Sequence, residues 1–252
     1  MLNAMAAGTR VQAMDFAASP RAKELTDLVT TFVAKEIEPV VDDYHRDVAR
    51  GGDHTTWAES QIMTELRAKA RAQGLWNLFL PVGHDQPYAE QFGTHGGAGL
   101  TNLDYAPVAE AMGRATTLAP YVFNCNAPDT GNMEVLLKYG TPEQKQTWLE
   151  PLLDGQIRSM FGMTEPGVAS SDATNMAATA VLDGDDVVIN GTKWFSTGVG
   201  HPDCKVMIFM GLTDPDADRH RRHSMVLVPL DAEGVEVQRM LPTMGIYDEP
   251  VG

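Results

Sequence analysis

The first part of the chain has the spacing of apolar residues that is typical of helices. One stripe recurs every three or four positions and consists of Leu25, Leu28, Val29, Phe32, Val33 and Ile37. Ser19-Pro20 precedes it. A serine oxygen can accept from the first amides of a helix, and proline at the first helical position gives up a donor that would be unpaired anyway. We therefore predict a helix that begins at this pair.

Further helices are predicted downstream of this stripe. They span roughly Thr55 to Gln73, about Thr101 or Leu103 to Met112, and Thr141 to Leu149. The last begins with Thr-Pro-Glu-Gln, in which Gln144 is placed to complete a capping box. Pro128 and Asp129 indicate one more helix start, and capping accounts for the aspartate there, although the segment from 127 to 132 is also suited to lining a pocket.

After residue 155 the pattern changes to short apolar runs that are typical of strands. An apolar run covers Ile157 to Met163, and a hairpin signal joins Ala177–Leu182 to Val187–Ile189 through Asp-Gly-Asp-Asp. Two more strands are predicted at Cys204–Leu212 and Ser224–Leu230. We therefore expect an α+β multidomain protein: a tail over 1–18, an all-helical domain over 19–154, and a β-barrel-like domain over 155–252 that is incomplete.

Composition narrows the class of protein. A hydrophobic content of 43% in 252 residues excludes global disorder, and the net charge of −15 argues against nucleic acid or an anionic membrane as a partner. The two cysteines have neither metal-site nor disulfide-framework spacing, which favours a reducing compartment and predicts no metal site. No apolar run reaches the roughly 20 residues of a membrane span, and no secretory signal is expected. A mitochondrial leader stays open, because Met1–Met14 has no acidic residue.

Two segments carry candidate chemistry. The first runs from Phe161 through Thr164-Glu-Pro to Ser170-Ser-Asp, and the second is Lys193-Trp-Phe-Ser-Thr-Gly198. Small and hydroxyl-bearing residues in the first suit a backbone that wraps closely around a flat polar ligand. The second places two aromatic rings before two hydroxyl groups. A turn, a core tryptophan and a solvated serine are the structural alternatives for the same residues.

Together the two segments resemble the flavin-embracing elements of the acyl-CoA dehydrogenases. That family has the same order of domains, a helical N-terminal domain and a middle β-barrel, followed by a C-terminal four-helix bundle. The sequence resembles in particular the subgroup called family members 10 and 11. This resemblance rests on Thr101–Glu110, on Phe123–Glu134, and on one extra residue within Thr164–Ser171.

The resemblance implies FAD as the cofactor and assigns roles to residues. The backbone around Met163 and Thr164 would contact the pyrimidine edge of the flavin. Trp194 would lie over or beside the dimethylbenzene end, and Ser196 would donate a hydrogen bond to flavin N5. Phe161, Ser170 and Phe195 are also expected to bind the cofactor. Ser171 would contact the acyl-CoA substrate. These are the expected cofactor- and substrate-binding residues.

The basic cluster between Asp214 and His223 has two interpretations. It is either a solvated loop between strands or a site where Arg219, Arg221 or Arg222 approaches the phosphates of coenzyme A. For substrate binding we single out Arg219 and Arg222.

The reaction implied by the family is α,β-dehydrogenation of an acyl-CoA thioester. A carboxylate removes the α-proton, hydride passes to flavin N5, and an electron-transfer flavoprotein reoxidises the flavin. The family's base lies in the C-terminal bundle, which we expect to be absent from this chain, so no catalytic residue is predicted. Alternatives are an acyl-CoA oxidase, or a non-catalytic acyl-CoA-binding or scaffold partner.

Four further expectations concern binding, association and location. The chain alone would bind FAD weakly and would associate, because the faces that pack on the bundle are uncovered. The full-length protein would be a homo-oligomer. Its location would be the cytoplasm in a bacterium, and mitochondria or peroxisomes in a eukaryote. Acyl chain length is not specified by these motifs.

Overall fold

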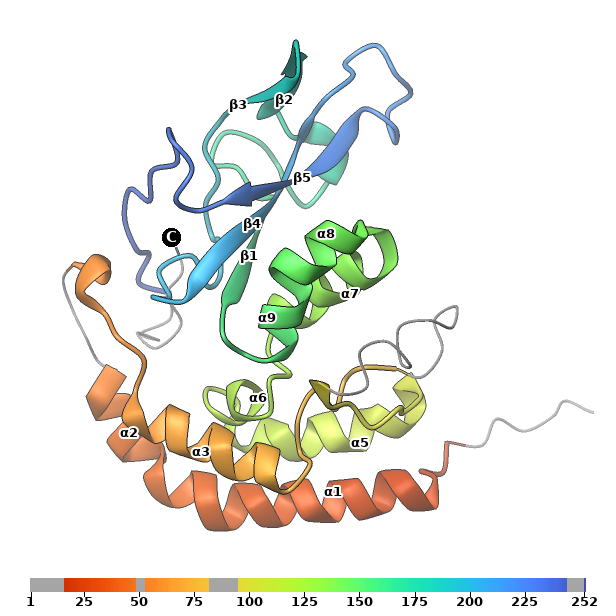
Figure 1. The fold of residues 1–252 in the computed structure, drawn as a ribbon, viewed down its shortest axis with the longest axis vertical. Helices are drawn as coiled ribbons and strands as arrows, with labels where there is room; N and C mark the ends of the chain where they lie inside the picture. The colour runs from red at the N-terminus through yellow and green to blue at the C-terminus, as the bar shows by residue number, and fades with distance from the viewer. Residues whose placement is uncertain (1–15, 49–52, 82–94, 244–251) are drawn as a thin grey trace, which may run out of the picture.

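The computed structural model describes residues 16–48, 53–81, 95–243 and 252. Within these parts the helices come first along the chain and the strands last, and the strands join in one sheet (Figure 1). The predicted α+β class is confirmed. The helices are α1 Pro20–Phe32, α2 Val41–Val48, α3 Gln61–Ala72, α5 Asn102–Met112, α6 Ala119–Val122, α7 Asp129–Tyr139, α8 Pro142–Gln144 and α9 Glu150–Leu153.

Helix α1 begins as its sequence predicts. Ser19 Oγ accepts a hydrogen bond from the Ala22 amide at 3.1 Å. The apolar stripe is buried apart from Leu28, which is 42% exposed. A π-helical turn at Val33–Ile37 carries the chain on towards α2. Pro39 has no amide hydrogen to continue the regular ladder, which accounts for a widened turn just before it.

The predicted helix from Thr55 is too long at its N-terminal end. A 3₁₀ turn covers His54–Thr56, and α3 itself begins at Gln61, where Ser60 Oγ accepts from the Ile62 amide at 3.2 Å. Serine at this position competes with the upstream residues as the cap, so the regular helix starts later. The capping box of Thr141 and Gln144 is present.

The sheet is centred on β4, Cys204–Leu212. β1, Arg158–Gly162, and β2, Thr179–Asp183, both pair with β4 in parallel, and β2 pairs with β3, Asp186–Asn190, as an antiparallel hairpin. β5, His223–Pro229, lies antiparallel to β4. The strands predicted from the sequence are thus all present: β4 has the predicted ends, and the ends of the others are shifted by one or two residues.

The two faces of the sheet have different surroundings. On one face, Ile157 and Leu227 pack against the apolar cluster formed by α7, α9 and the turn between them, and Figure 1 shows these helices beside β1 and β4. On the other face, Phe209 and Val228 form a small cluster with Ala178 and Ala180. That second face borders a cavity of about 630 Å³. In the described residues, none of the helices has the length and apolar character needed to span a membrane.

Candidate functional site

The structure brings the two candidate segments side by side. The Trp194 amide donates to the Thr164 carbonyl at 3.0 Å. The ammonium of Lys193 donates to the Met163 carbonyl at 3.0 Å and to the Glu165 carboxylate at 2.7 Å. Segments that are thirty residues apart in the sequence therefore form one continuous surface of backbone and side chain.

The buried carboxylate of Glu165 holds the Thr-Glu-Pro turn in place through hydrogen bonds. This carboxylate also accepts from the amides of Ala177 at 2.8 Å and Ala178 at 3.0 Å, at the entry to β2. Burial alone would raise the pKa of Glu165, but the hydrogen bonds from Lys193 and these two amides hold the pKa below its usual value. The carboxylate is therefore ionised, and the turn is held by charge-assisted bonds.

Ser170 has a structural part in this turn. Its hydroxyl accepts from the Glu165 amide at 2.8 Å and is buried, with 6% of the residue exposed. Ser171, by contrast, is exposed to solvent. Of the two serines, Ser171 is thus the one open to a ligand.

The predicted cofactor residues do not all face the same way. Met160, Trp194 and Ser196 line the cavity of about 630 Å³. Phe161 and Met163 do not line it, as expected for strand positions that alternate with Met160. Ser196 lines this cavity although only 4% of the residue is exposed.

The backbone turns sharply between Trp194 and Ser196. Phe195 has a φ of +50°, is 49% exposed, and meets the Trp194 ring edge to face at 4.8 Å between centroids. The amide of Ser196 donates to the Gly252 carbonyl at 2.9 Å. Thr197, which follows, is half-buried and is the second hydroxyl of the segment. A left-handed phenylalanine is unusual, and such strain is typical of ligand-binding segments.

The backbone N–H of Thr164, a half-buried residue, and the buried indole N–H of Trp194 have no acceptor in the part of the chain that the structure describes. Buried donors are nearly always paired in native proteins, so the Trp194 N–H is available to an acceptor of a ligand. The Thr164 N–H is likewise open to a ligand oxygen or nitrogen.

The basic loop between Asp214 and His223 contacts the segment that follows Ser171. Arg219 forms an ion pair with Asp172, directly after Ser171, and its Nε donates to Thr174 Oγ1 at 2.6 Å. Arg222 has a buried Nε without a partner among the described residues. Arg221 is exposed.

A second polar cluster was missed by the sequence reasoning. Arg158 Nη1, from β1, donates to Asn124, to Asn126 and to Asp129 at 3.1, 2.9 and 3.1 Å. We expected Asp129 to cap α7, and this is wrong. Its Oδ1 instead accepts from the amide and hydroxyl of Ser159 at 2.8 and 2.6 Å. The cluster joins the start of α7 to the start of β1.

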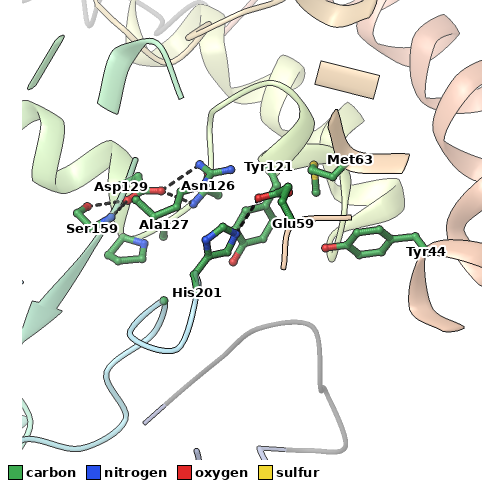
Figure 2. Close-up of a pocket in the computed structure, with 12 residues that line it drawn as sticks. Tyr44, Glu59, Met63, Tyr121, Asn126, Ala127, Asp129, Ser159 and His201 are labelled. Carbon is green, nitrogen blue, oxygen red and sulfur yellow. Dashed lines mark hydrogen bonds and ion pairs between the residues drawn. The ribbon is translucent and has the colours of Figure 1, made fainter. Parts of the chain in front are cut away.

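Figure 2 shows the small cavity beside this cluster, about 20 Å³ in volume. His201 and Asp129 both line it, and His201 Nε2 lies 3.1 Å from the Glu59 carboxylate. A second guanidinium group, that of Arg67, lies within electrostatic range of Arg158. Burial first, and the charge of Arg158 second, lower the pKa of Arg67 to about 10. A cavity of this size holds about one water molecule.

One group of side chains, His201, Glu59 and Asp203, has the residue types of a metal site. The tautomer of His201, however, does not suit metal binding. Nδ1 of His201 accepts from the Asp203 amide at 3.1 Å, so the proton of a neutral ring lies on Nε2, facing Glu59. That nitrogen then carries its proton on the side of the Glu59 carboxylate, 3.1 Å away, and has no lone pair for a metal ion.

Comparison with known proteins gives consistent matches along the chain. The family model of the acyl-CoA dehydrogenase N-terminal domain matches residues 19–156, and that of the middle domain matches residues 160–252. The probable acyl-CoA dehydrogenase FadE2 of Mycobacterium tuberculosis is 48% identical over 93% of this chain and 54% of its own length. Acyl-CoA dehydrogenase family member 10 of Mus musculus is 46% identical over 93% of the chain and 21% of its own. Family member 11 of the same species is 45% identical over 94% and 29%.

Solved structures show the same fold. An acyl-CoA dehydrogenase-like structure from Mycobacterium abscessus superimposes with a TM-score of 0.82 at 60% identity, over 94% of this chain and 56% of that one. Glutaryl-CoA dehydrogenase from Mycobacterium smegmatis in complex with FADH2 has a TM-score of 0.66 at 21% identity, over 92% and 51%. The chain thus spans about half, or less, of the length of the relatives it matches.

Proposed function

Because the chain belongs to the acyl-CoA dehydrogenase family, we propose that the protein containing it is an FAD-dependent enzyme that oxidises an acyl-CoA thioester to its α,β-unsaturated form. The resemblance to family members 10 and 11 is confirmed by their 45–46% identity. When bound, FAD supplies the acceptor for the hydride leaving the β-carbon. A homo-oligomer, and an electron-transfer flavoprotein as electron acceptor, belong to the same proposal.

The meeting of the two candidate segments carries this proposal. The bond from the Trp194 amide to the Thr164 carbonyl fixes their spacing, and the N–H of Thr164 has no acceptor among the described residues. The pyrimidine edge of a flavin presents oxygen and nitrogen acceptors, so this donor set fits it. We assign the backbone at Met163 and Thr164 to that edge, with Phe161 alongside. Ser170 then supports the turn from behind.

The aromatic pair Trp194 and Phe195 is proposed to contact the flavin ring system. The exposed ring of Phe195 and the unpaired indole N–H of Trp194 are both free for such contacts in the described structure. Stacking of this kind holds a planar ring without competing for its hydrogen bonds.

The hydroxyl that serves flavin N5 comes from the pair Ser196 and Thr197. The sequence favours Ser196, but its side chain is buried on the cavity face. Thr197 is half-buried and does not line that cavity. The variants Ser196→Ala and Thr197→Val distinguish them, because loss of the N5 donor should slow flavin reduction about tenfold to a thousandfold in stopped-flow measurements while leaving acyl-CoA affinity nearly unchanged. If neither variant slows reduction, no hydroxyl of this pair acts at N5.

Ser171, Arg219 and Arg222 are proposed to bind the acyl-CoA substrate. Ser171 is exposed next to the flavin-side turn, and the unpaired Nε of Arg222 suits a phosphate oxygen. Arg219 must first leave Asp172 to do the same. Arg222→Gln should therefore raise KM for acyl-CoA with little change in kcat. An unchanged KM would show that Arg222 does not bind the substrate.

Anaerobic titration tests the function as a whole. The protein is loaded with FAD, and acyl-CoA substrates of different chain length are added while the flavin absorbance is followed. Bleaching of the oxidised flavin bands supports dehydrogenation. A protein that binds acyl-CoA but neither binds FAD nor bleaches it would instead support the non-catalytic alternative. Rapid reoxidation of the reduced protein by oxygen would favour an oxidase.

A further inference from the structure

Lys193 occupies an unusual position behind the candidate flavin-binding backbone. Its ammonium donates to three oxygen atoms, those of the Met163 carbonyl at 3.0 Å, the Glu165 carboxylate at 2.7 Å and the Met210 carbonyl at 2.8 Å, and the Met176 sulfur lies 3.8 Å away. Its side chain is only 7% exposed. All three ammonium protons are therefore used, and the charge is held at one place.

The ammonium acts on one particular peptide group. The carbonyl of Met163 and the N–H of Thr164 belong to the same planar unit, whose electrons are delocalised. A cation on the oxygen draws electron density from the nitrogen, so the N–H becomes a stronger donor. That N–H has no acceptor among the described residues.

We propose that Lys193 is a positioning residue that tunes the bound flavin through the Met163–Thr164 peptide, by strengthening the Thr164 N–H bond to the pyrimidine edge. This inference rests on the proposed function. Reduction places negative charge on that edge, so a stronger donor stabilises the reduced flavin more than the oxidised flavin. Lys193 would thereby raise the reduction potential of the flavin.

Glu165 is one of several groups that stabilise the charged ammonium, and the two backbone carbonyls of Met163 and Met210 also do so. Burial lowers the pKa of Lys193, and the carboxylate at 2.7 Å opposes that shift. The face of the Phe209 ring, 4.8 Å from Nζ, adds a further favourable contact for a cation. The Lys193–Glu165 pair is shielded from solvent, so dissolved salt screens its charges little. Its electrostatic effect on the Met163–Thr164 peptide is therefore stronger than that of a solvent-exposed pair at the same distance.

The test compares the midpoint potential of bound FAD in three variants with that in the unmodified protein. Lys193→Gln/Glu165→Gln removes both charges together, so no charge is left buried alone. Glu165→Gln removes only the carboxylate and leaves the ammonium on the Met163 carbonyl. Lys205→Met is the matched control, because Lys205 Nζ also bonds a backbone carbonyl, that of Pro202 at 2.9 Å, but on the exposed surface.

The double variant should favour oxidised over reduced flavin by about tenfold relative to the unmodified protein, which for a two-electron couple lowers the potential by about 30 mV. Glu165→Gln should raise the potential, and the control should not change it. An unchanged or raised potential in the double variant overturns the inference while leaving the function intact. If the double variant does not fold, Glu165→Gln decides: a raised potential supports the role of the ammonium, and an unchanged or lowered one overturns it. If the unmodified protein binds no FAD, the proposed function itself fails.

Discussion

Removing the carboxylate of Asp129 should destabilise the protein far more than removing a surface carboxylate. Asp129 is 2% exposed and pairs with Arg158, whose side chain is 4% exposed. Breaking a buried pair by deleting one partner costs about 3–5 kcal/mol, because the other charge stays buried without compensation. The Ser159 amide also loses its acceptor, which adds about 1–3 kcal/mol. Asp129→Leu should thus lower the free energy of unfolding by at least about 4 kcal/mol.

A double variant separates the ion pair from the rest of the packing. Asp129→Leu/Arg158→Met removes both charges and keeps apolar bulk, so it should be clearly more stable than Asp129→Leu alone. Asp43→Ala is the control. It breaks the pair between Asp43 and Arg46, which are 57% and 72% exposed, and such pairs contribute about 0–1 kcal/mol.

Urea unfolding followed by circular dichroism and tryptophan fluorescence measures these differences. The comparison uses the change in unfolding free energy at constant m-value. A loss of less than about 1 kcal/mol in Asp129→Leu would show that the cluster is hydrated and that Arg158 is not desolvated, contrary to the reasoning above. A double variant less stable than the single one would show that the hydrogen bonds, and not the charges, dominate.

Three shorter predictions concern the β region. Gly191→Ala should have a much lower melting temperature than Gly184→Ala in a thermal scan, because a Cβ at Gly191 would lie 2.3 Å from the Ala178 Cβ, whereas nothing lies within 4 Å of a Cβ at Gly184. Equal melting temperatures would contradict the close approach of Gly191 to Ala178. Cys204 should resist alkylation at pH 8 in native protein and react in denaturant, as measured by mass spectrometry, because burial raises its thiol pKa to about 12; rapid native labelling would exclude this. The pKa of Glu165 is lowered on folding, so the stability that its carboxylate contributes is fully present above the usual pKa of 4.5 and is lost as the pH falls through the lowered pKa. Glu165→Gln should therefore flatten that part of the curve of unfolding free energy against pH. An unaltered curve would count against a lowered pKa of Glu165.

Local signals in the sequence predicted most of the elements but not their ends. Ser19 and Thr141 mark helix starts correctly, because a cap depends on residues within one turn. The start of α3 was predicted too early, since nothing local excludes a helix before Ser60. The π-helical turns were not predicted at all. Each lies just before a proline, Pro39 and Pro151, but Pro107 lies within α5 and no π-helical turn precedes it in the described residues, so a proline alone does not predict such a turn.

The candidate site was predictable as two segments but not as an arrangement. Motif resemblance locates Thr164 and Trp194, and the structure shows the bond between them. The sequence does not show that Ser196 faces a cavity, since that depends on the left-handed turn at Phe195. Nor does it show the cluster around Arg158, whose partners lie about thirty residues away in the chain. Long-range polar contacts of this kind have no local pattern.

The parallel pairing of β1 with β4 has a consequence for folding order. Both candidate segments, 163–165 and 193–196, lie within the connection that joins these two strands. Such a pair must close a long loop, at a cost in chain entropy, before its contacts form. The backbone that is proposed to hold the flavin therefore takes shape in the step that completes the sheet, and not before it. A chain halted ahead of that step would leave both edges of β4 open to pair with another chain, so slow synthesis or mild heat should favour aggregation through this strand.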